Sequence, residues 1–418
     1  MASSRLVEKL SAEEKPWLKK KEPRERWAYW LTAAMAFIGL ACAALVIYLG
    51  WTGVRQLKDS DVCLVLDDEF NSLDLTNTWT RDVELGGFGN GEFQMTTSDS
   101  ANSFIKNGQL YIRPTLTSDD IGADKVVNGG SVTLPGCTAN SDDSSSGSSS
   151  ANCSASSNGQ TAIPPVKSAR LHTKGHYSIQ YGRVEVRAKL PRGDWLWPAI
   201  WMLPVDTTKY GPWPQSGEID IMEARGNAAS YAAQGVNFVR STLNYGPFAA
   251  LQTQIIGWWQ EKQFNYAEGF HTYALEWSPS FVRTYVDSRL QATLTVDITG
   301  RGGHSFFDRG HYPATAHNGS DTEVAVENIW AKDGGTAAAP FDQQFYLILD
   351  LAVGGTSGWF PDGVGDKPWF DTAGDEAALL AFAQAQKVWS ATWPSNEDDV
   401  SFRIDSVKMY KLKSNGKC

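Results

Sequence analysis

The sequence predicts an all-β sandwich of two antiparallel sheets, preceded by one transmembrane helix. An uncharged stretch, Trp27 to Val54, lies near the N-terminus. Further along, segments such as 183–190 alternate apolar and charged residues. This period of two is expected of a β-strand with one solvent-exposed face. The chain after residue 60 contains no repeat and no sign of a second domain, so residues 61–418 are expected to form one domain.

Residues 27–54 are expected to form a transmembrane signal anchor. Leu31 to Gly50 is almost wholly apolar, long enough for one helical span of ~20 residues. The alternative is a cleaved signal peptide, whose apolar region would be only ~7–15 residues long. Aromatic residues flank both ends of the stretch, as at membrane interfaces: Trp27, Tyr29, Trp30, Tyr48 and Trp51.

Residues 1–26 form a charged tail with eight Lys or Arg and five Asp or Glu residues. Because basic residues are denser before the apolar stretch than in the linker 55–60, the positive-inside rule places the N-terminus in the cytosol. The large domain would then be extracellular or lumenal, as in a single-pass type II membrane protein. The sequence does not decide between the plasma membrane and an internal secretory membrane.

Charge and aromatic content limit the partners of the large domain. The whole chain carries −10 and the first 26 residues carry +3, which leaves −13 for the rest. Such an acidic surface argues against nucleic acid as a partner. The 17 Trp residues suit a neutral polysaccharide, because sugar rings stack on flat aromatic faces, although many of these side chains are expected in the core.

Four cysteines outside the apolar stretch fit an oxidising compartment, and four cysteines allow three pairings. Cys137 and Cys153 flank a Ser-rich run and are placed to close it. Cys63 opens the domain and Cys418 ends the chain, and since domain termini often lie close together, a second disulfide between them is plausible.

Two further features of the sequence concern glycosylation and flexibility. Asn152 and Asn318 each begin an Asn-x-Ser acceptor for N-glycosylation. The Ser-rich segment 138–160 cannot bury apolar surface, so it is predicted to be a flexible loop.

The remaining elements are predicted from apolar runs, alternation and turn residues. A short surface helix is expected at 375–390, where Ala is frequent. Strands or hairpins are expected at 64–70, 107–114, 181–190, 193–204, 218–223, 241–247, 270–279, 281–295, 340–355 and 400–410.

The segment 217–225, Gly-Glu-Ile-Asp-Ile-Met-Glu-Ala-Arg, holds three carboxylates in six residues. In a strand, Glu218 and Asp220 share one face, whereas Glu223 would point to the other. A β-bulge at Ile221–Met222 would return Glu223 to the acidic face, and we predict that bulge. Two carboxyl groups brought to roughly 5–5.5 Å suit a retaining glycosidase, with one as nucleophile and one as proton donor.

Glu-Ile-Asp-Ile-Met-Glu resembles the active-site strand of glycoside hydrolase family 16, in the bulged form typical of laminarinases and β-1,3-glucan recognition proteins. Segments 67–70, 88–94, 195–203, 270–279 and 340–355 extend the resemblance over residues ~61–412. It implies a concanavalin A-like β-jelly roll whose concave face holds the glycan. It also implies roles for three residues: Glu218 as nucleophile, Asp220 as its hydrogen-bonded assistant, and Glu223 as general acid/base.

The substrate-binding residues expected from the resemblance and from their chemistry surround this motif. Three positions depart from the family pattern: Asn244 and Tyr245 stand where relatives usually carry His and Trp, and Asp350 stands where they usually carry Asn. The candidates are Trp197, Trp201, Trp213, Asn90, Glu92 and Asn244.

The sequence therefore predicts a membrane-anchored, retaining endo-β-glucanase that hydrolyses β-1,3- or mixed β-1,3/1,4-glucan. A cell-wall glucan transglycosylase and a non-catalytic glucan-binding protein are the alternatives. The retention of all three acids weighs against the binding protein, because relatives that only bind have lost them. No cofactor is required and no zinc or nucleotide motif occurs, while a structural calcium is compatible with the resemblance.

Overall fold

A computed structural model describes residues 8, 10–11, 13–16, 22–139, 150–300, 302–319, 322–413 and 418. The chain divides into two compact units, Met1–Gln56 and Leu57–Cys418. Most of the predicted tail 1–26 and the centre of the predicted Ser-rich loop lie outside the described residues.

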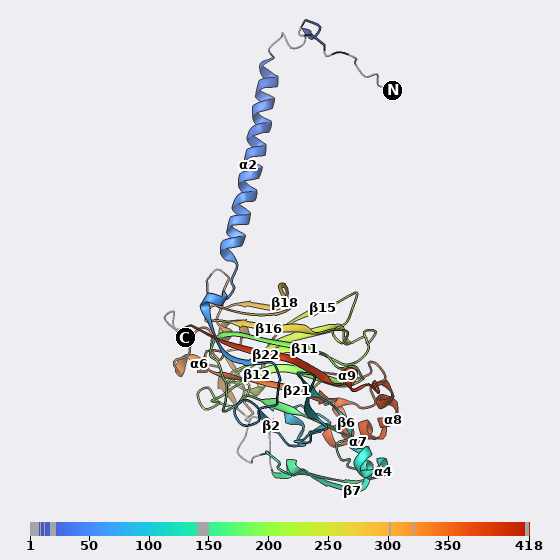
Figure 1. Ribbon diagram of the computed structural model, residues 1–418. Helices are drawn as coiled ribbons and strands as arrows, with labels where there is room; N and C mark the ends of the chain where they lie inside the picture. The colour runs from blue at the N-terminus through green and yellow to red at the C-terminus, as the bar shows by residue number, and fades with distance from the viewer. Residues whose placement is uncertain are drawn as a thin grey trace. The chain divides into compact units, whose positions relative to one another are not determined.

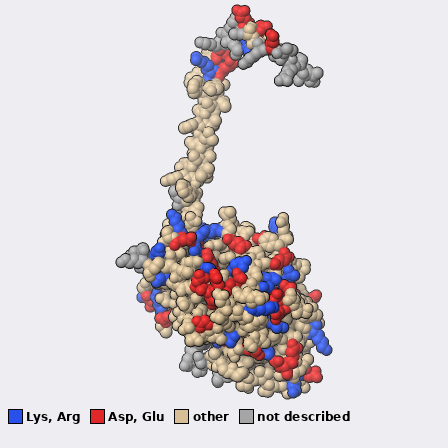
Figure 2. Space-filling model, viewed as in Figure 1, with Lys and Arg blue, Asp and Glu red and all other residues tan. Residues whose placement is uncertain are grey.

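The first unit contains α2 (Pro23–Gly53; Figure 1). Large apolar side chains along this helix are exposed, among them Phe37, Leu40 and Ile47. Among the described residues this is the one helix long and apolar enough to cross a membrane, by length and composition. Figure 2 shows it as tan along most of its length, because its charged residues Arg24, Glu25 and Arg26 all lie in its first turn. Since a signal sequence has the same properties, the helix by itself does not distinguish an anchor from a signal peptide.

The second unit is a sandwich of two antiparallel sheets, which confirms the predicted fold class. One sheet has seven strands among the described residues, in the order β15 (Thr253–Gln260), β14 (Phe238–Tyr245), β13 (Glu218–Glu223), β12 (Leu196–Pro204), β21 (Phe345–Val353), β10 (Arg170–His172) and β2 (Thr80–Asp82). The other has eight, in the order β18 (Ser288–Asp297), β17 (Phe281–Val286), β16 (His271–Trp277), β11 (Gly182–Lys189), β22 (Phe402–Leu412), β5 (Gln109–Ile112) and β4 (Ser103–Lys106), with β1 (Val62–Asp68) also paired to β22.

Shorter elements surround the sandwich. Three small sheets pair β3 (Gln94–Thr96), β9 (Val166–Ser168) and β6 (Thr115–Leu116); β7 (Asn128–Thr133) and β8 (Ser154–Asn158); and β19 (Thr315–His317) and β20 (Glu323–Ala325). The short helices are α3 (Ser118–Ile121), α4 (Ala123–Val127), α5 (Phe306–Gly310), α6 (Ile329–Lys332), α7 (Asp375–Gln384), α8 (Gln386–Trp389) and α9 (Glu397–Val400).

Two local expectations need correction. Residues 154–158 belong to strand β8 and not to a loop, because they pair with β7. The helix expected at 375–390 divides into α7 and α8, and it does not simply lie on the surface. Phe382 and Trp389 are buried and stack with ring centroids 4.5 Å apart, so this segment packs into the core.

The core between the sheets follows from strand alternation. On β12 and β13 the side chains of Ile200, Met202 and Ile219 are fully buried. Their neighbours Trp201, Glu218 and Asp220 point to the opposite face of the same sheet, where they line a cavity. The sandwich thus uses one face of the seven-stranded sheet for stability and leaves the other for a site.

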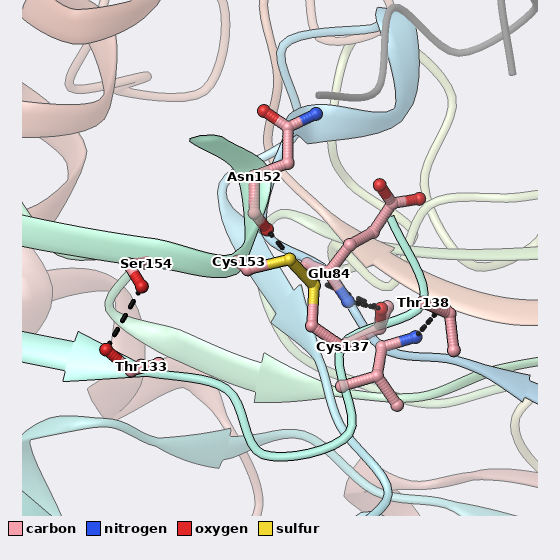
Figure 3. The surroundings of a disulfide bond; sticks show 9 residues. Glu84, Thr133, Cys137, Thr138, Asn152, Cys153 and Ser154 are labelled. Carbon is pink, nitrogen blue, oxygen red and sulfur yellow. Dashed lines mark hydrogen bonds between the residues drawn. A yellow bond between two sulfur atoms is a disulfide. The ribbon is translucent and has the colours of Figure 1, made fainter. Parts of the chain in front are cut away.

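Two disulfides are formed, Cys63–Cys418 and Cys137–Cys153. Figure 3 shows the second beside Asn152, whose backbone oxygen accepts a hydrogen bond from Leu85 N at 2.9 Å.

The two glycosylation acceptors differ in surroundings. Asn152 is half-buried next to Cys153, within a short 3-10 helix, Ser150–Cys153. Asn318 is exposed after β19, and Ser320 of its acceptor lies outside the described residues.

Candidate active site

The predicted bulge is present on β13. Met222 pairs with Ile200 on β12, but the next pair joins Asp220 to Trp201, so Ile221 is the extra residue. Toward β14 the pairing likewise passes from Asp220–Thr242 to Glu223–Arg240. The extra residue turns Glu223 onto the face of Glu218 and Asp220, and all three line one cavity.

This cavity lies over β2, β10, β21, β12 and β13 and has a volume of about 250 Å³. Polar and aromatic side chains line it, which is the composition expected of a carbohydrate site. Its lining includes Asp82, Phe88, Asn90, Glu92, Arg170, Trp197, Trp201, Trp213, Glu218, Asp220, Glu223, Tyr346 and Asp350.

Glu218 is held by amide and carboxyl partners. The Asn244 Nδ2 group donates to Glu218 Oε1 at 2.8 Å and to Asp220 Oδ2 at 2.9 Å. Burial, followed by the charge of Glu223, raises the pKa of Glu218 to about 7. Asn244 favours the ionised form of Glu218, because a hydrogen bond donated to a carboxylate stabilises its charge.

Asp220 lies between the two glutamates and is 5% exposed. Burial and the charges of Glu218 and Glu223 hold its pKa well above the usual range of an aspartate. The hydrogen bond between Asp220 and Glu218 raises the pKa of Asp220 and lowers the pKa of Glu218, so a proton shared by the two is favoured on Asp220.

Glu223 has a different environment on the far side of the bulge. Its Oε1 accepts a hydrogen bond from Trp197 Nε1 at 3.1 Å. Burial raises its pKa, and the nearby charge of Arg240 opposes that rise. Trp197 is fixed in turn by a parallel stack on Trp359, with ring centroids 4.8 Å apart. Arg225 lies over the Trp359 ring at 4.1 Å, so the contact of Trp197 with Glu223 rests on a packed aromatic support.

A second charged group lies in the same cavity around Arg170. Arg170 pairs with Asp82 at 3.0 Å, and its guanidinium lies over the rings of Phe88 at 4.4 Å and Trp201 at 4.8 Å. Trp201 Nε1 donates to Asp350 Oδ1 at 2.7 Å. Burial, then the charge of Glu92, raises the pKa of Asp350 to about 7.

Five of the six expected substrate-binding residues line the cavity: Trp197, Trp201, Trp213, Asn90 and Glu92. The sixth, Asn244, does not belong to the cavity wall. It is 4% exposed and holds the acids from beneath, while its Oδ1 accepts from Gln254 Nε2 at 2.8 Å. This acceptor bond orients the amide so that Nδ2 faces the carboxyl groups.

Asn90 and Glu92 bind each other as well as lining the wall, since Asn90 Nδ2 donates to Glu92 Oε1 at 3.0 Å. Gln94 Nε2 donates to the other oxygen, Oε2, at 2.6 Å and is itself buried. The pair thus presents one positioned carboxyl group to the cavity.

Sequence reasoning missed several residues of the site. Arg170, Phe88 and Tyr346 line the cavity. Phe88 and Tyr346 lie in segments that carry the family resemblance, but the sequence does not show that the fold brings them together with Arg170. Regular alternation through the predicted strand 193–204 places Trp195 on the face of Trp197 and Trp201. Instead its backbone is left-handed, with φ of 68°, and its ring lies in the core against Trp369.

Among the described residues, no group of three or more His, Cys, Asp or Glu side chains is arranged to hold a metal ion. The side chains that line the cavity include carboxyl groups, an arginine and the rings of Trp, Tyr and Phe.

Comparison with known proteins places these features among glucan-related proteins. The family model for glycosyl hydrolases family 16 matches residues 139–336. The beta-1,3-glucan-binding protein of Penaeus monodon is 39% identical over 384 residues, 90% of this chain and 96% of that protein. Glucan endo-1,3-beta-glucosidase A1 of Niallia circulans is 30% identical over 301 residues, which are 70% of this chain and 34% of the enzyme.

A solved structure agrees with the sandwich fold. The X-ray structure of the laminarinase from Rhodothermus marinus aligns with a TM-score of 0.50 and 26% identity, over 84% of this chain and 98% of that one. The relatives thus include several proteins named for glucan binding and others named for glucan cleavage.

Proposed function

Because the chain belongs to glycosyl hydrolases family 16, we propose that it is a retaining endo-glucanase that hydrolyses β-1,3- or mixed β-1,3/1,4-glucan. The observation that carries the proposal is the bulge at Ile221, which leaves Glu218, Asp220 and Glu223 on one face of one cavity. A straight strand would have separated the two glutamates, and no double displacement would be open to them.

In the proposed reaction, Glu218 attacks the anomeric carbon as a carboxylate. Glu223 protonates the oxygen of the leaving sugar and then removes a proton from the water that hydrolyses the glycosyl-enzyme. Protonated Asp220 and the Asn244 amide donate to Glu218, which favours its ionised form before attack. Trp197 fixes the carboxyl group of Glu223 at the bulge.

The test is hydrolysis of laminarin and of barley β-glucan by Glu218→Gln and Glu223→Gln variants, with reducing ends as the readout. Each change keeps the size of the side chain, and each is expected to remove nearly all activity while the fold is retained. Glu376→Gln, at an exposed position in the first turn of α7, is the matched control and should behave as the unchanged protein. Full activity in either active-site variant would refute the assigned roles.

Glucan binding without hydrolysis is the second candidate function, because the relative from Penaeus monodon is named as a binding protein. The two candidates make different predictions for the unaltered chain. A binding protein retains insoluble β-1,3-glucan and releases no reducing ends, whereas the enzyme shortens it. The three acids of β13 support the enzyme, since binding alone needs no raised carboxyl pKa values.

For the N-terminal unit we propose a signal anchor that holds the glucanase outside the cytosol. The length of α2 and the two disulfides of the second unit support this placement. N-terminal sequencing of the mature protein and alkali extraction of membranes test it. An intact α2 that resists extraction supports the anchor, and a chain that begins after α2 identifies a cleaved signal peptide.

A further inference from the structure

The edge strand β15 carries an exposed apolar surface on the face that holds the acids. Its residues alternate, with Gln254, Ile256, Trp258 and Gln260 exposed and those between them partly buried. Ile256 is 47% and Trp258 is 55% exposed, which is unusual for large apolar side chains. None of these residues belongs to the cavity described above.

The direction of these side chains follows from their contacts. Gln254 Nε2 donates to Asn244 Oδ1, and Asn244 donates to Glu218 and Asp220, so the even-numbered side chains of β15 share the face of the acids. The odd-numbered face of β14 points the other way. Ser241 Oγ lies 2.9 Å from Thr293 Oγ1 on β18, in the other sheet.

Strand register connects each acid to one exposed side chain of β15. Glu223 pairs with Arg240, and Arg240 pairs with Trp258. Asp220 likewise pairs with Thr242, and Thr242 pairs with Ile256. Because neighbouring strands lie ≈ 4.7–4.9 Å apart, Trp258 is roughly 10 Å from the row of acids, a length that a few sugar units cover.

Trp258 is also held in a fixed position. Its ring stacks on Phe238 with centroids 4.8 Å apart and planes inclined at 30°. Phe238 is 7% exposed and packs against the indole, while Trp258 itself remains 55% exposed, so part of its ring faces solvent. A supported indole with one free face is the arrangement on which a pyranose ring stacks.

We propose that Trp258, with Ile256 beside it, forms a separate glucan subsite on β15, which takes a β-glucan chain that continues past the acids over β14. This inference rests on the proposed function, because it extends the same substrate beyond the cavity. The cavity lies on the β12 side of β13 and β15 lies on the other. The bound polysaccharide would therefore occupy both sides of the acids, as cleavage within a chain requires.

The experiment measures the affinity of the full chain for laminari-oligosaccharides of increasing length by titration calorimetry. Glu218→Gln serves as the background, so that no substrate is consumed. We expect affinity to rise with length, and Trp258→Ala to lower the affinity for the long members by roughly five- to thirty-fold, which flattens the length dependence. Trp258→Phe, which keeps a ring on Phe238, should restore much of the difference.

Phe370→Ala is the matched control, because Phe370 is an aromatic side chain with 59% exposure that does not line the cavity. A length dependence in Trp258→Ala equal to that of its parent would overturn the inference alone. A changed oligomeric state in Trp258→Ala with unchanged affinity would also overturn it, and would assign the patch to a second copy of the chain. Failure of the parent to bind any laminari-oligosaccharide would remove the proposed function together with this subsite.

Discussion

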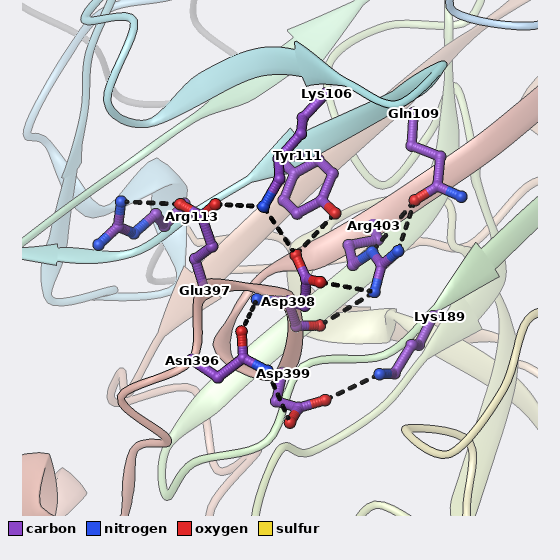
Figure 4. Close-up of polar contacts among 10 residues, drawn as sticks. All are labelled: Lys106, Gln109, Tyr111, Arg113, Lys189, Asn396, Glu397, Asp398, Asp399 and Arg403. Atoms are coloured by element: carbon purple, nitrogen blue, oxygen red, sulfur yellow. Dashed lines mark hydrogen bonds and ion pairs between the residues drawn. The ribbon is translucent and has the colours of Figure 1, made fainter.

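Two clusters of acidic side chains in the same domain have opposite electrostatic character. In the cavity, Glu218 and Asp220 accept from one amide, Glu223 accepts from an indole, and burial raises the pKa of each. On the eight-stranded sheet, the acids of α9 contact cations. Figure 4 shows that cluster: Glu397, Asp398 and Asp399 with Lys106, Arg113, Lys189 and Arg403.

Asp398 illustrates the second environment. Tyr111 donates to its Oδ1 at 2.8 Å, and this hydrogen bond lowers the pKa of Asp398. Its side chain is 37% exposed, so solvent also favours its charge. An acidic cluster in a sequence therefore does not by itself reveal whether its carboxyl groups are reactive or structural. Burial beside other acids raises carboxyl pKa values toward neutral pH, where such groups can exchange protons. Carboxyl groups that contact cations and solvent stay ionised and connect elements of the fold.

The largest expected difference between the two clusters is in catalysis. Glu223→Gln should reduce the rate of laminarin hydrolysis by roughly 10²–10⁴-fold, because it removes the proposed proton donor. Glu397→Gln makes the same chemical change in the other cluster and should leave the rate unaltered. Initial rates of reducing-end release compare the two. Equal rates in the two variants would show that the environment of the acids does not determine their role.

A smaller loss is expected when the support of Glu218 is removed. Asn244→Ala deletes a hydrogen bond to a buried carboxylate, and such bonds contribute ≈ 1.5–3 kcal/mol, equivalent to roughly 10–100-fold in rate. Without the donated bond the pKa of Glu218 rises. Since the reaction needs the ionised form, the acidic limb of kcat/KM against pH should move to higher pH. A limb that stays in place would assign Asn244 to packing only.

Asp350→Asn tests the raised pKa of Asp350 through its effect on the free energy of unfolding. The pKa of Asp350 is about 7 in the fold, above the 3.8 of an unperturbed aspartate. Between these values the unfolded chain releases a proton that the folded chain retains, so stability falls as pH rises. Asn keeps an oxygen that accepts from Trp201 and carries no charge.

The variant should therefore gain on the order of 1–3 kcal/mol at pH 7 and almost nothing at pH 4, as measured by urea unfolding. A gain of equal size at both pH values would contradict the raised pKa. It would leave only a packing effect of the amide.

The smallest effect, with the opposite sign, is expected for Asp398→Asn. Because the pKa of Asp398 is lowered in the fold, its charge stabilises the protein above the unfolded pKa and ceases to do so as pH falls. Solvent screening limits the loss at pH 7 to about 1 kcal/mol or less. Urea unfolding should show this loss of stability at pH 7 and not at pH 3. The rate of laminarin hydrolysis should be unchanged.

The sandwich and the acidic strand could be predicted from the sequence because both depend on local alternation. The bulge was predictable for the same reason, since a period of two leaves Glu223 on the wrong face and one inserted residue corrects it. Trp195 was wrongly placed because its left-handed backbone interrupts the alternation that the prediction assumed.

The rest of the site depends on contacts between distant segments. Arg170 and Phe88 meet only after β10 has joined the seven-stranded sheet. The role of Asn244 depends on its register against Glu218, and the exposed face of β15 depends on its register against β14. Sequence pattern gives the face of a residue within its own strand, but not the residue opposite it.

The measurement that tests the account most directly is ¹H nuclear magnetic resonance of laminari-oligosaccharide cleavage by the unaltered chain, recorded before the new reducing ends mutarotate. Two glutamates brought to one face by the bulge predict that the β-anomer appears first, through a glycosyl-enzyme on Glu218. Initial release of the α-anomer, or no cleavage at all, would contradict the claim that this bulged strand performs a double displacement.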